Sequence, residues 1–270
     1  MNASSPPASL RWRENPGHRR WLRAEADALF AFFEPDSIDP SGGFHALDNS
    51  GRASAGVTER TLPATTRLVH CFAIAHLLGR PGAADWRVPE HYHADWSTDL
   101  GYKGSDVFRP YGYTPGHALE WARLALQLWA LGGRKLEWLP DAARRLFAQA
   151  LAQGWDARGG LYYTIEYDGA PRVRDRLWWP MCEGVGAAHF LAALDGDAFH
   201  EDWYRRLWDF IARRQIDRRE GGWHPQLDDS LNPIPGYFVG KPDLYHALQA
   251  CLIPLYPADG SLTRGILTGS

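Results

Sequence analysis

A histidine and a glutamate stand one helical turn apart in residues 108–121, FRPYGYTPGHALEW. Thr114 is a suitable N-cap residue, because its hydroxyl can accept a hydrogen bond from an unpaired helix N–H group, and a proline follows at the first helical position. His117, Glu120 and Trp121 then project from one face of the predicted helix. An imidazole, a carboxylate and an indole suit proton transfer on a polar small molecule, although structural hydrogen-bond networks also gather such groups.

A second set of candidate residues lies in the C-terminal half of the chain. Trp179 and Glu183 are four positions apart, so they share a face of a predicted helix. His246 lies near the start of another predicted helix, which Pro242 opens. Each histidine could also be a buried ring that hydrogen-bonds a neighbour. Since an unperturbed imidazole titrates near pH 6.5, either ring could act as an acid or a base near neutral pH.

Three cations are candidates for binding the oxygen atoms of a substrate. The forked guanidinium of Arg67 could hold a hydroxyl or an oxyanion, and its alternative is a surface ion pair. Arg109 and Lys241 are weaker candidates, because cations in loops are usually solvated. The sequence contains no convincing set of metal ligands, no phosphate-binding loop and no dinucleotide fingerprint, so we expect neither a metal nor a cofactor.

The elements that must position these residues are mainly helical. Apolar residues at helical spacing predict about seven helices, over residues 20–33, 63–78, 115–131, 140–152, 179–194, 201–215 and 242–255. Between them, Gly-Gly steps at residues 42–43, 159–160 and 221–222 each precede alternating residues, and the second step predicts a hairpin that turns at Asp168-Gly169.

The Gly-Gly steps recur at about two and then one unit of roughly 60 residues, which is typical of an array of helix pairs. We therefore expect an all-α fold, an (α/α) toroid of the six-hairpin barrel type with short β-hairpins at one end. A ring of six helix pairs needs roughly 350 residues or more. A chain of 270 residues thus predicts an incomplete ring.

Length and composition predict one soluble domain. We expect it to span residues 11–258, with tails at residues 1–10 and 259–270. A net charge of -3 argues against nucleic acid as a partner. No apolar run is long enough to span a membrane, residues 1–10 lack a hydrophobic signal core, and the three cysteines are far apart in sequence. These features favour a cytoplasmic protein.

Residues 108–121, 175–183 and 240–250 resemble the N-acylglucosamine 2-epimerase superfamily, and most of all its mannose isomerase and sulfoquinovose isomerase branch. Residues 66–70 are similar to the beginning of that family. The resemblance has a gap, because members carry further helix pairs where this chain passes directly from residues 78–82 to residues 90–96. We therefore expect an internal deletion near residues 80–90.

The resemblance implies a cofactor-independent isomerase that interconverts an aldose and a ketose, of the mannose and fructose type, through an enediol. It implies that His117 and His246 are the acid–base couple, without deciding which of them takes the carbon-bound proton. Glu120 and Glu183 would bind sugar hydroxyls or orient a histidine, and Trp179 would stack on the sugar.

Three other functions remain open. A 2-epimerase of the same superfamily would use the same groups. A glycoside hydrolase on an (α/α) toroid would use two carboxylates, here Glu120 and Glu183. A truncated barrel could also be an inactive remnant that binds sugar. The expected partner is a monosaccharide, and a homo-oligomer is left open.

Overall fold

The computed structural model describes residues 11–37, 48–52, 90–91, 99–106, 109–241 and 244–268. The predicted helix over residues 63–78, the first Gly-Gly step and Arg67 lie outside these ranges. The helices of the described residues are α1 (Pro16–Ser37), α3 (Pro115–Leu131), α4 (Trp138–Gly154), α5 (Trp178–Asp195), α6 (Ala198–Phe210), α7 (Tyr245–Leu252) and α8 (Leu262–Thr268).

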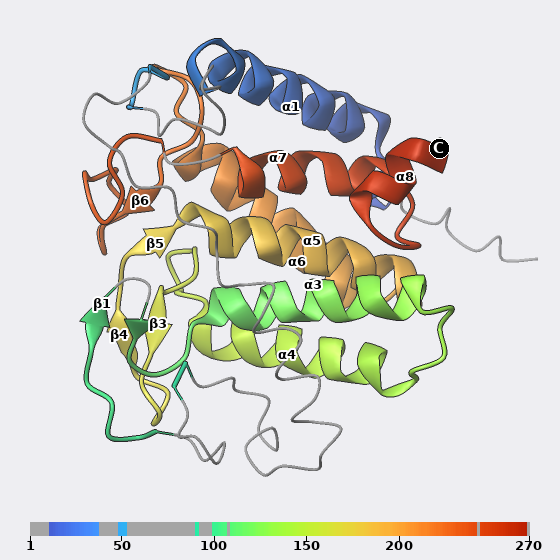
Figure 1. Cartoon of the computed structure of the whole chain (residues 1–270), viewed down its shortest axis with the longest axis horizontal. Coiled ribbons are helices and arrows are strands. Elements are labelled where there is room, and N and C mark those ends of the chain that lie inside the picture. Colours follow the sequence, from blue (N-terminus) through green and yellow to red (C-terminus); the bar gives the residue numbers. More distant parts are fainter. Residues whose placement is uncertain are drawn as a thin grey trace, which may run out of the picture.

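Six of these helices form three pairs. α3, α5 and α7 are successive neighbours, with α4 packed on α3, α6 on α5 and α1 on α7. In Figure 1, α3, α5 and α7 begin at the end of the molecule that carries the short strands, and α1, α4 and α6 run back toward that end. This alternation of direction is the pattern that the repeat of helix pairs predicts.

The strands of the described residues form three short antiparallel pairs. β1 (Ser105–Asp106) pairs with β2 (Arg109–Pro110), β3 (Thr164–Ile165) with β4 (Pro171–Val173), and β5 (Arg176–Leu177) with β6 (Gln226–Leu227). The predicted turn at Asp168-Gly169 is confirmed, since Gly169 has a φ of 92° and the flanking residues pair as β3 and β4. A residue with a side chain would be strained in that left-handed conformation.

The core centres on α5. Every residue from Trp178 to Ala192 is buried, so the helix has no polar face and must be surrounded. α3, α4, α6 and α7 all pack against it. One consequence is that Glu183, on the second turn of α5, lies in the core with only 2% of its surface exposed. A carboxylate in that position requires partners from the neighbouring helices.

The observed helix boundaries agree closely with the predicted ones. α3 spans the predicted residues, and the predicted helix over 201–215 is α6 followed by a π-helical turn, Ile211–Gln215. The predicted hydroxyl cap at Thr114 is wrong: its backbone occupies the N-cap position, but its buried hydroxyl has no hydrogen-bond partner among the described residues. The Thr114 carbonyl instead accepts from the N–H groups of His117 and Ala118.

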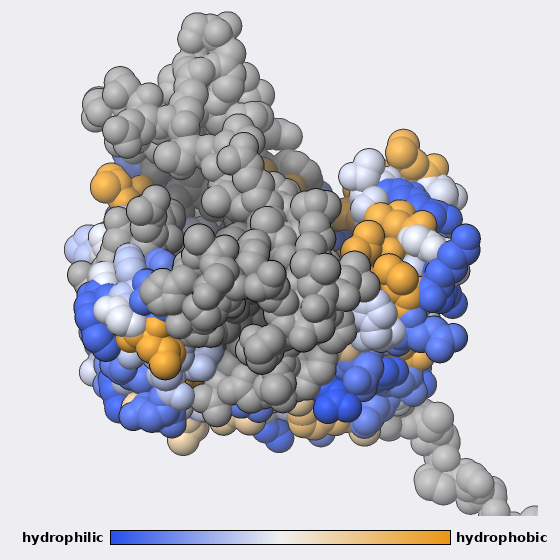
Figure 2. Space-filling view, turned by 60° about the horizontal axis from the view of Figure 1, so that its bottom comes forward, coloured by the Kyte–Doolittle hydropathy of each residue, from blue (hydrophilic) through white to orange (hydrophobic). Residues whose placement is uncertain are grey.

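On the face that Figure 2 shows, the described surface is mostly hydrophilic, with separate hydrophobic patches. Figure 2 shows hydrophobic surface on the side of the view where α3 ends in Figure 1. Leu128 and Leu131, on the last turn of α3, and Leu136, in the loop after it, are roughly half exposed. Within the described residues, no helix is long and apolar enough to span a membrane. α8 lies inside residues 259–270, the segment that the sequence analysis treats as a tail.

Candidate active site

The candidate histidines lie at the starts of neighbouring helices. His117 is on the first turn of α3, His246 is on the first turn of α7, and Trp179 is on the first turn of α5 between them in the order of packing. Because all three helices begin at the end that carries the strands, residues far apart in sequence come together there (Figure 1).

Trp179 contacts both imidazoles. Its ring centroid is 4.9 Å from that of His117 and 5.8 Å from that of His246, with the planes tilted by 35° and 39°. Gly116 permits this approach, since a Cβ at that position would lie 2.7 Å from the indole ring. Tyr163 meets the indole edge-on, with centroids 6.3 Å apart. Two titratable rings and an aromatic surface therefore meet at one place.

His246 is bound to a buried carboxylate that is itself bound to an arginine. Its Nδ1 lies 2.9 Å from Glu183 Oε1. Arg123, on α3, donates from Nε to Glu183 Oε2 at 2.6 Å and from Nη1 to Gln127 Oε1 at 2.9 Å. Both oxygens of Glu183 are thus engaged, one by each partner. Arg123 and Glu183 are each only 2% exposed.

His117 is bound to a different carboxylate in a more open setting. Its Nδ1 lies 2.8 Å from Glu90 Oε1, with side-chain exposures of 25% for His117 and 10% for Glu90. The backbone N–H of Glu90 donates to the carbonyl of Gly112, two residues before the N-cap of α3. The site therefore contains two imidazole–carboxylate pairs, His117–Glu90 and His246–Glu183.

The surrounding charges shift the pKa values of these groups. Burial alone would lower the pKa of His117, but the charge and hydrogen bond of Glu90, with smaller contributions from Glu120 and Glu183, raise that pKa to about 9. Burial and the neighbouring charge of Glu183 raise the pKa of Glu120. Burial would also raise the pKa of Glu183, but Arg123 and His246 outweigh it and hold Glu183 ionised.

The structure gives different information on each of the three cations predicted for the site. Lys241 is buried, and its ammonium donates to Asp217 Oδ2 at 2.8 Å and to the carbonyl of Gly221. It therefore braces the third Gly-Gly step, and a role in binding substrate stays a prediction. The backbone of Arg109 lies in β2, and Arg67 is outside the described residues.

The sequence analysis missed two residues of this site, Arg123 and Glu90. Arg123 follows Glu120 by three positions, so the helical period places both on one face, but the partner of Arg123 is 60 residues away on α5. Glu90 is 27 residues from His117. Among the described residues, no group of three or more metal-binding side chains could hold a metal ion.

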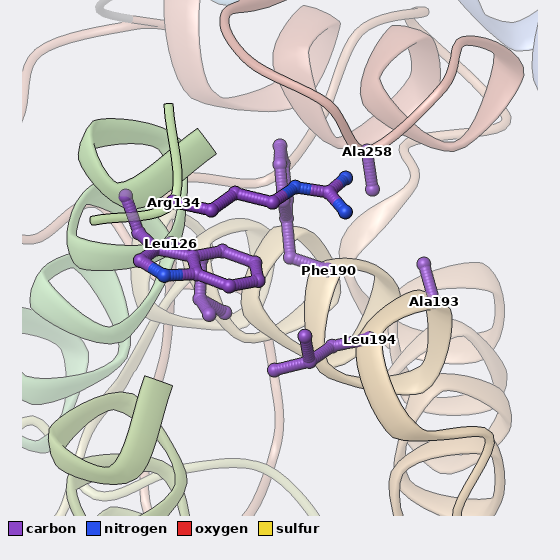
Figure 3. A pocket seen from close by; sticks show the side chains of 7 residues that line it. Leu126, Arg134, Phe190, Ala193, Leu194 and Ala258 are labelled. Carbon is purple, nitrogen blue, oxygen red and sulfur yellow. The ribbon is translucent and has the colours of Figure 1, made fainter. Parts of the chain in front are cut away.

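A small cavity lies at the opposite end of α3 and α5 from the histidines. Its volume is about 90 Å³, below the roughly 300–1,000 Å³ typical of ligand pockets. Figure 3 shows the side chain of Arg134 extending across it, past Phe190 and above Leu194. Its other lining residues are Leu126, Trp129, Ala193 and Ala258. It is separate from the candidate active site.

Comparison with solved structures defines the class of fold. A crystal structure titled D-mannose isomerase matches 93% of this chain and 99% of its own, with a TM-score of 0.73 and 20% sequence identity. Cellobiose 2-epimerase from Bacillus thermoamylovorans matches 87% of this chain and 71% of its own, with a TM-score of 0.55 and 13% identity. The all-α toroid of the six-hairpin barrel type is thereby confirmed as the fold class.

Comparison of sequences shows the family. The model of the N-acylglucosamine 2-epimerase (GlcNAc 2-epimerase) family matches residues 42–86 and 82–250, two segments that meet where the sequence analysis expects the deletion. The chain belongs to this family.

Several curated relatives are named D-mannose isomerase. The one from Thermobifida fusca is 43% identical over 203 residues, covering 72% of this chain and 50% of the relative. The one from Pseudomonas cannabina pv. alisalensis is 41% identical over 217 residues, covering 77% of this chain and 50% of the relative. The chain spans about half the length of the curated relatives it matches.

Proposed function

We propose that this chain interconverts an aldose and its 2-ketose, with mannose and fructose as the pair to test, by proton transfer through an enediol. The observation that carries the proposal is the contact of His117 and His246 with one indole, that of Trp179. The relatives named D-mannose isomerase support the choice of sugar. The indole offers an apolar face against which the C–H groups of a sugar ring can pack.

The different partners of the two histidines suggest different roles. With a pKa raised to about 9 by Glu90, His117 is protonated at neutral pH and can donate to the carbonyl oxygen O1. Glu183 shares its charge with Arg123, so it stabilises a protonated His246 less than an unpaired carboxylate would. We therefore assign His246 as the base that takes the proton from C2.

The proposed reaction conserves every proton. His246 removes the C2 proton while His117 protonates O1, which gives the enediol. While the enediol is bound, the proton on His246 exchanges with solvent. His117 then takes the proton of the C2 hydroxyl as the C2 carbonyl forms, and His246 delivers the exchanged proton to C1, which gives the ketose. A 2-epimerase would instead return a proton to the opposite face of C2, and two histidines against one indole suit that outcome as well.

The arrangement of Glu183 argues against a glycoside hydrolase. A hydrolase of this kind needs one carboxylate available as a nucleophile or base. Both oxygens of Glu183 are occupied, by His246 and Arg123, and the carboxylate is in the core. A glycosidase that used Glu120 and Glu183 would first have to break these contacts.

The test is incubation with mannose in D₂O, followed by NMR. We expect fructose with deuterium at C1, whereas glucose with deuterium at C2 would show an epimerase. His117→Ala and His246→Ala should each lower the rate about a hundredfold or more, since general acid–base catalysis contributes that much. His200→Gln is the matched control, because His200 also pairs with a carboxylate, Asp195, but on α6. A cooperatively folded chain that exchanges no deuterium into mannose would overturn the proposal.

A further inference from the structure

Arg123 is buried to an extent that is unusual for an arginine. Only 2% of its surface is exposed, and it lies between α3 and α5, bound to Glu183 and Gln127. Gly186, on α5, leaves room for it, because a Cβ at that position would lie 2.6 Å from Arg123 Cδ. Two positions on different helices are thus matched to one buried guanidinium.

Stability alone does not account for this guanidinium. Buried ion pairs lose the hydration of both charges, and apolar residues of similar volume are often equally stabilising or better. α5 is otherwise apolar around this point, so an apolar residue at position 123 would fit the core. The buried carboxylates Glu120 and Glu183, which repel one another, supply a different reason for a cation here.

The protonation of His246 depends on the charged groups of the helices that pack around α7. The titratable and charged groups at issue are Glu183 on α5, His117, Glu120 and Arg123 on α3, Tyr245 on α7 and Glu25 on α1. Glu25 accepts a hydrogen bond from Trp223 Nε1 at 2.7 Å. Arg123 is the permanently charged cation in this group, so its loss would leave the carboxylates to be neutralised by protons.

We propose that Arg123 is a positioning residue for the reaction, which keeps Glu183 ionised and so holds His246 with its proton on Nδ1. Nε2 is then the nitrogen that exchanges protons with the sugar. An ionised Glu183 can only accept a hydrogen bond, which fixes the tautomer of the ring. The kinetic consequence of this inference rests on the proposed function, whereas the structural consequence does not.

Removing the charge of Arg123 would change both Glu183 and His246. Two ionised carboxylates in one buried site need a compensating positive charge, so without the guanidinium a proton would bind to Glu183, to Glu120 or to His246. A proton on Glu183 would make it a donor and favour the other tautomer of His246. A proton on His246 would give the imidazolium form, which can no longer accept the proton from C2.

The spectroscopic test uses the full chain labelled with ¹⁵N-histidine, with His246→Gln to assign the ring. In the wild type we expect the neutral His246 ring to carry its proton on Nδ1. In Arg123→Met we expect the midpoint of its titration to move by about one pH unit, upward if the extra proton binds to His246, or downward with loss of the Nδ1–H tautomer if it binds to Glu183. Arg123→Lys retains the charge, so we expect a midpoint near that of the wild type. The His200–Asp195 pair in the same samples is the internal control.

Two results would overturn the inference. One is an Nε2–H tautomer of His246 in the wild type, which needs no variant and holds even if Arg123→Met does not fold. The other is a folded Arg123→Met whose His246 has the wild-type midpoint and tautomer. With mannose, we expect Arg123→Met to lower kcat about tenfold to a hundredfold with KM within about threefold. If the wild type lacks activity on mannose, the proposed function fails, and the spectra still decide the role of Arg123.

Discussion

The two imidazole–carboxylate pairs of this site share a chemistry but differ in their surroundings. His246–Glu183 lies in the core, and an arginine holds the carboxylate from behind. His117–Glu90 is more open, and its carboxylate comes from a segment before α3 rather than from a packed helix. The same contact between Nδ1 and a carboxylate oxygen is thus made once in a buried setting where a guanidinium shares the negative charge, and once in a setting that favours the protonated ring.

The difference teaches how one pair of residue types can serve two roles. A carboxylate with its charge intact favours the imidazolium form, and a carboxylate that shares its charge with a guanidinium does so less. The proposed assignment of His117 as acid and His246 as base rests on this difference. Variants that remove each carboxylate, or that disturb only the arginine, should therefore have distinct effects.

The largest effect is expected for Glu183→Gln. The change removes the carboxylate that is hydrogen-bonded to the buried Arg123, which costs about 3–5 kcal/mol of stability, and it removes the anchor of His246, so activity should fall about a hundredfold. Urea unfolding and the mannose assay measure the two losses. The double variant Arg123→Met/Glu183→Leu should regain most of the stability without activity. If Glu183→Gln were instead milder than Glu90→Gln, the comparison between the pairs would be reversed.

Glu90→Gln should mainly change the pH dependence of the activity. Without the negative charge the pKa of His117 falls from about 9, so the protonated acid is lost at lower pH. The alkaline limb of the pH–rate profile should move down by about one to two pH units, with activity at pH 6.5 changed only a few-fold. Glu166→Gln is the control, because Glu166 pairs with Arg172 in an exposed hairpin and should leave the profile in place. An unmoved alkaline limb in Glu90→Gln would remove His117 as the acid.

The same shift has a consequence for stability. The pKa of His117 is higher in the folded protein than in the unfolded chain, where it is about 6.5. The pair therefore stabilises the fold fully below pH 6.5, and this contribution is lost as pH rises toward 9. In Glu90→Gln that part of the pH dependence of the free energy of unfolding should shrink, because the pKa of His117 then lies nearer to 6.5.

A smaller effect is expected for Gly186→Ala, which touches neither pair directly. The new Cβ would lie 2.6 Å from Arg123 Cδ, so the guanidinium must move relative to Glu183. We expect kcat to fall about threefold to tenfold, although alanine favours a helix over glycine by about 1 kcal/mol. Gly184→Ala is the matched control on the same helix, where a Cβ would lie 3.1 Å or more from Leu207 and Leu119. Equal activities of the two variants would contradict the role given to Arg123.

The helices and hairpins could be predicted because their signals are local. The boundaries of α3 follow from apolar spacing and Pro115, and the β3–β4 turn follows from Asp168-Gly169. The hydroxyl of Thr114 shows the limit of such rules, since the backbone takes the N-cap position while other groups make the bonds. Local propensity fixes where a helix starts more reliably than which atom caps it.

The missed partners could not be predicted because they depend on packing. An arginine one turn after a glutamate, such as Arg123 after Glu120, is typical of a solvated helix face. Its burial depends on α5, a helix without a polar face, which lies against α3 and has Gly186 at the point of contact. The sequence shows each of these residues, but their convergence appears only once the helices are packed.

The smallest effect on activity is expected for Lys241→Met. This variant tests whether Lys241 belongs to the substrate-binding site. The sequence analysis predicts that Lys241 binds substrate, whereas its ammonium donates to Asp217 and to the carbonyl of Gly221. Since both members of this ion pair are buried, removing one should cost about 3 kcal/mol or more in urea unfolding, with KM for mannose within about twofold. A tenfold rise in KM without loss of stability would instead make Lys241 a sugar ligand, and the site would then extend beyond the two pairs to the third Gly-Gly step.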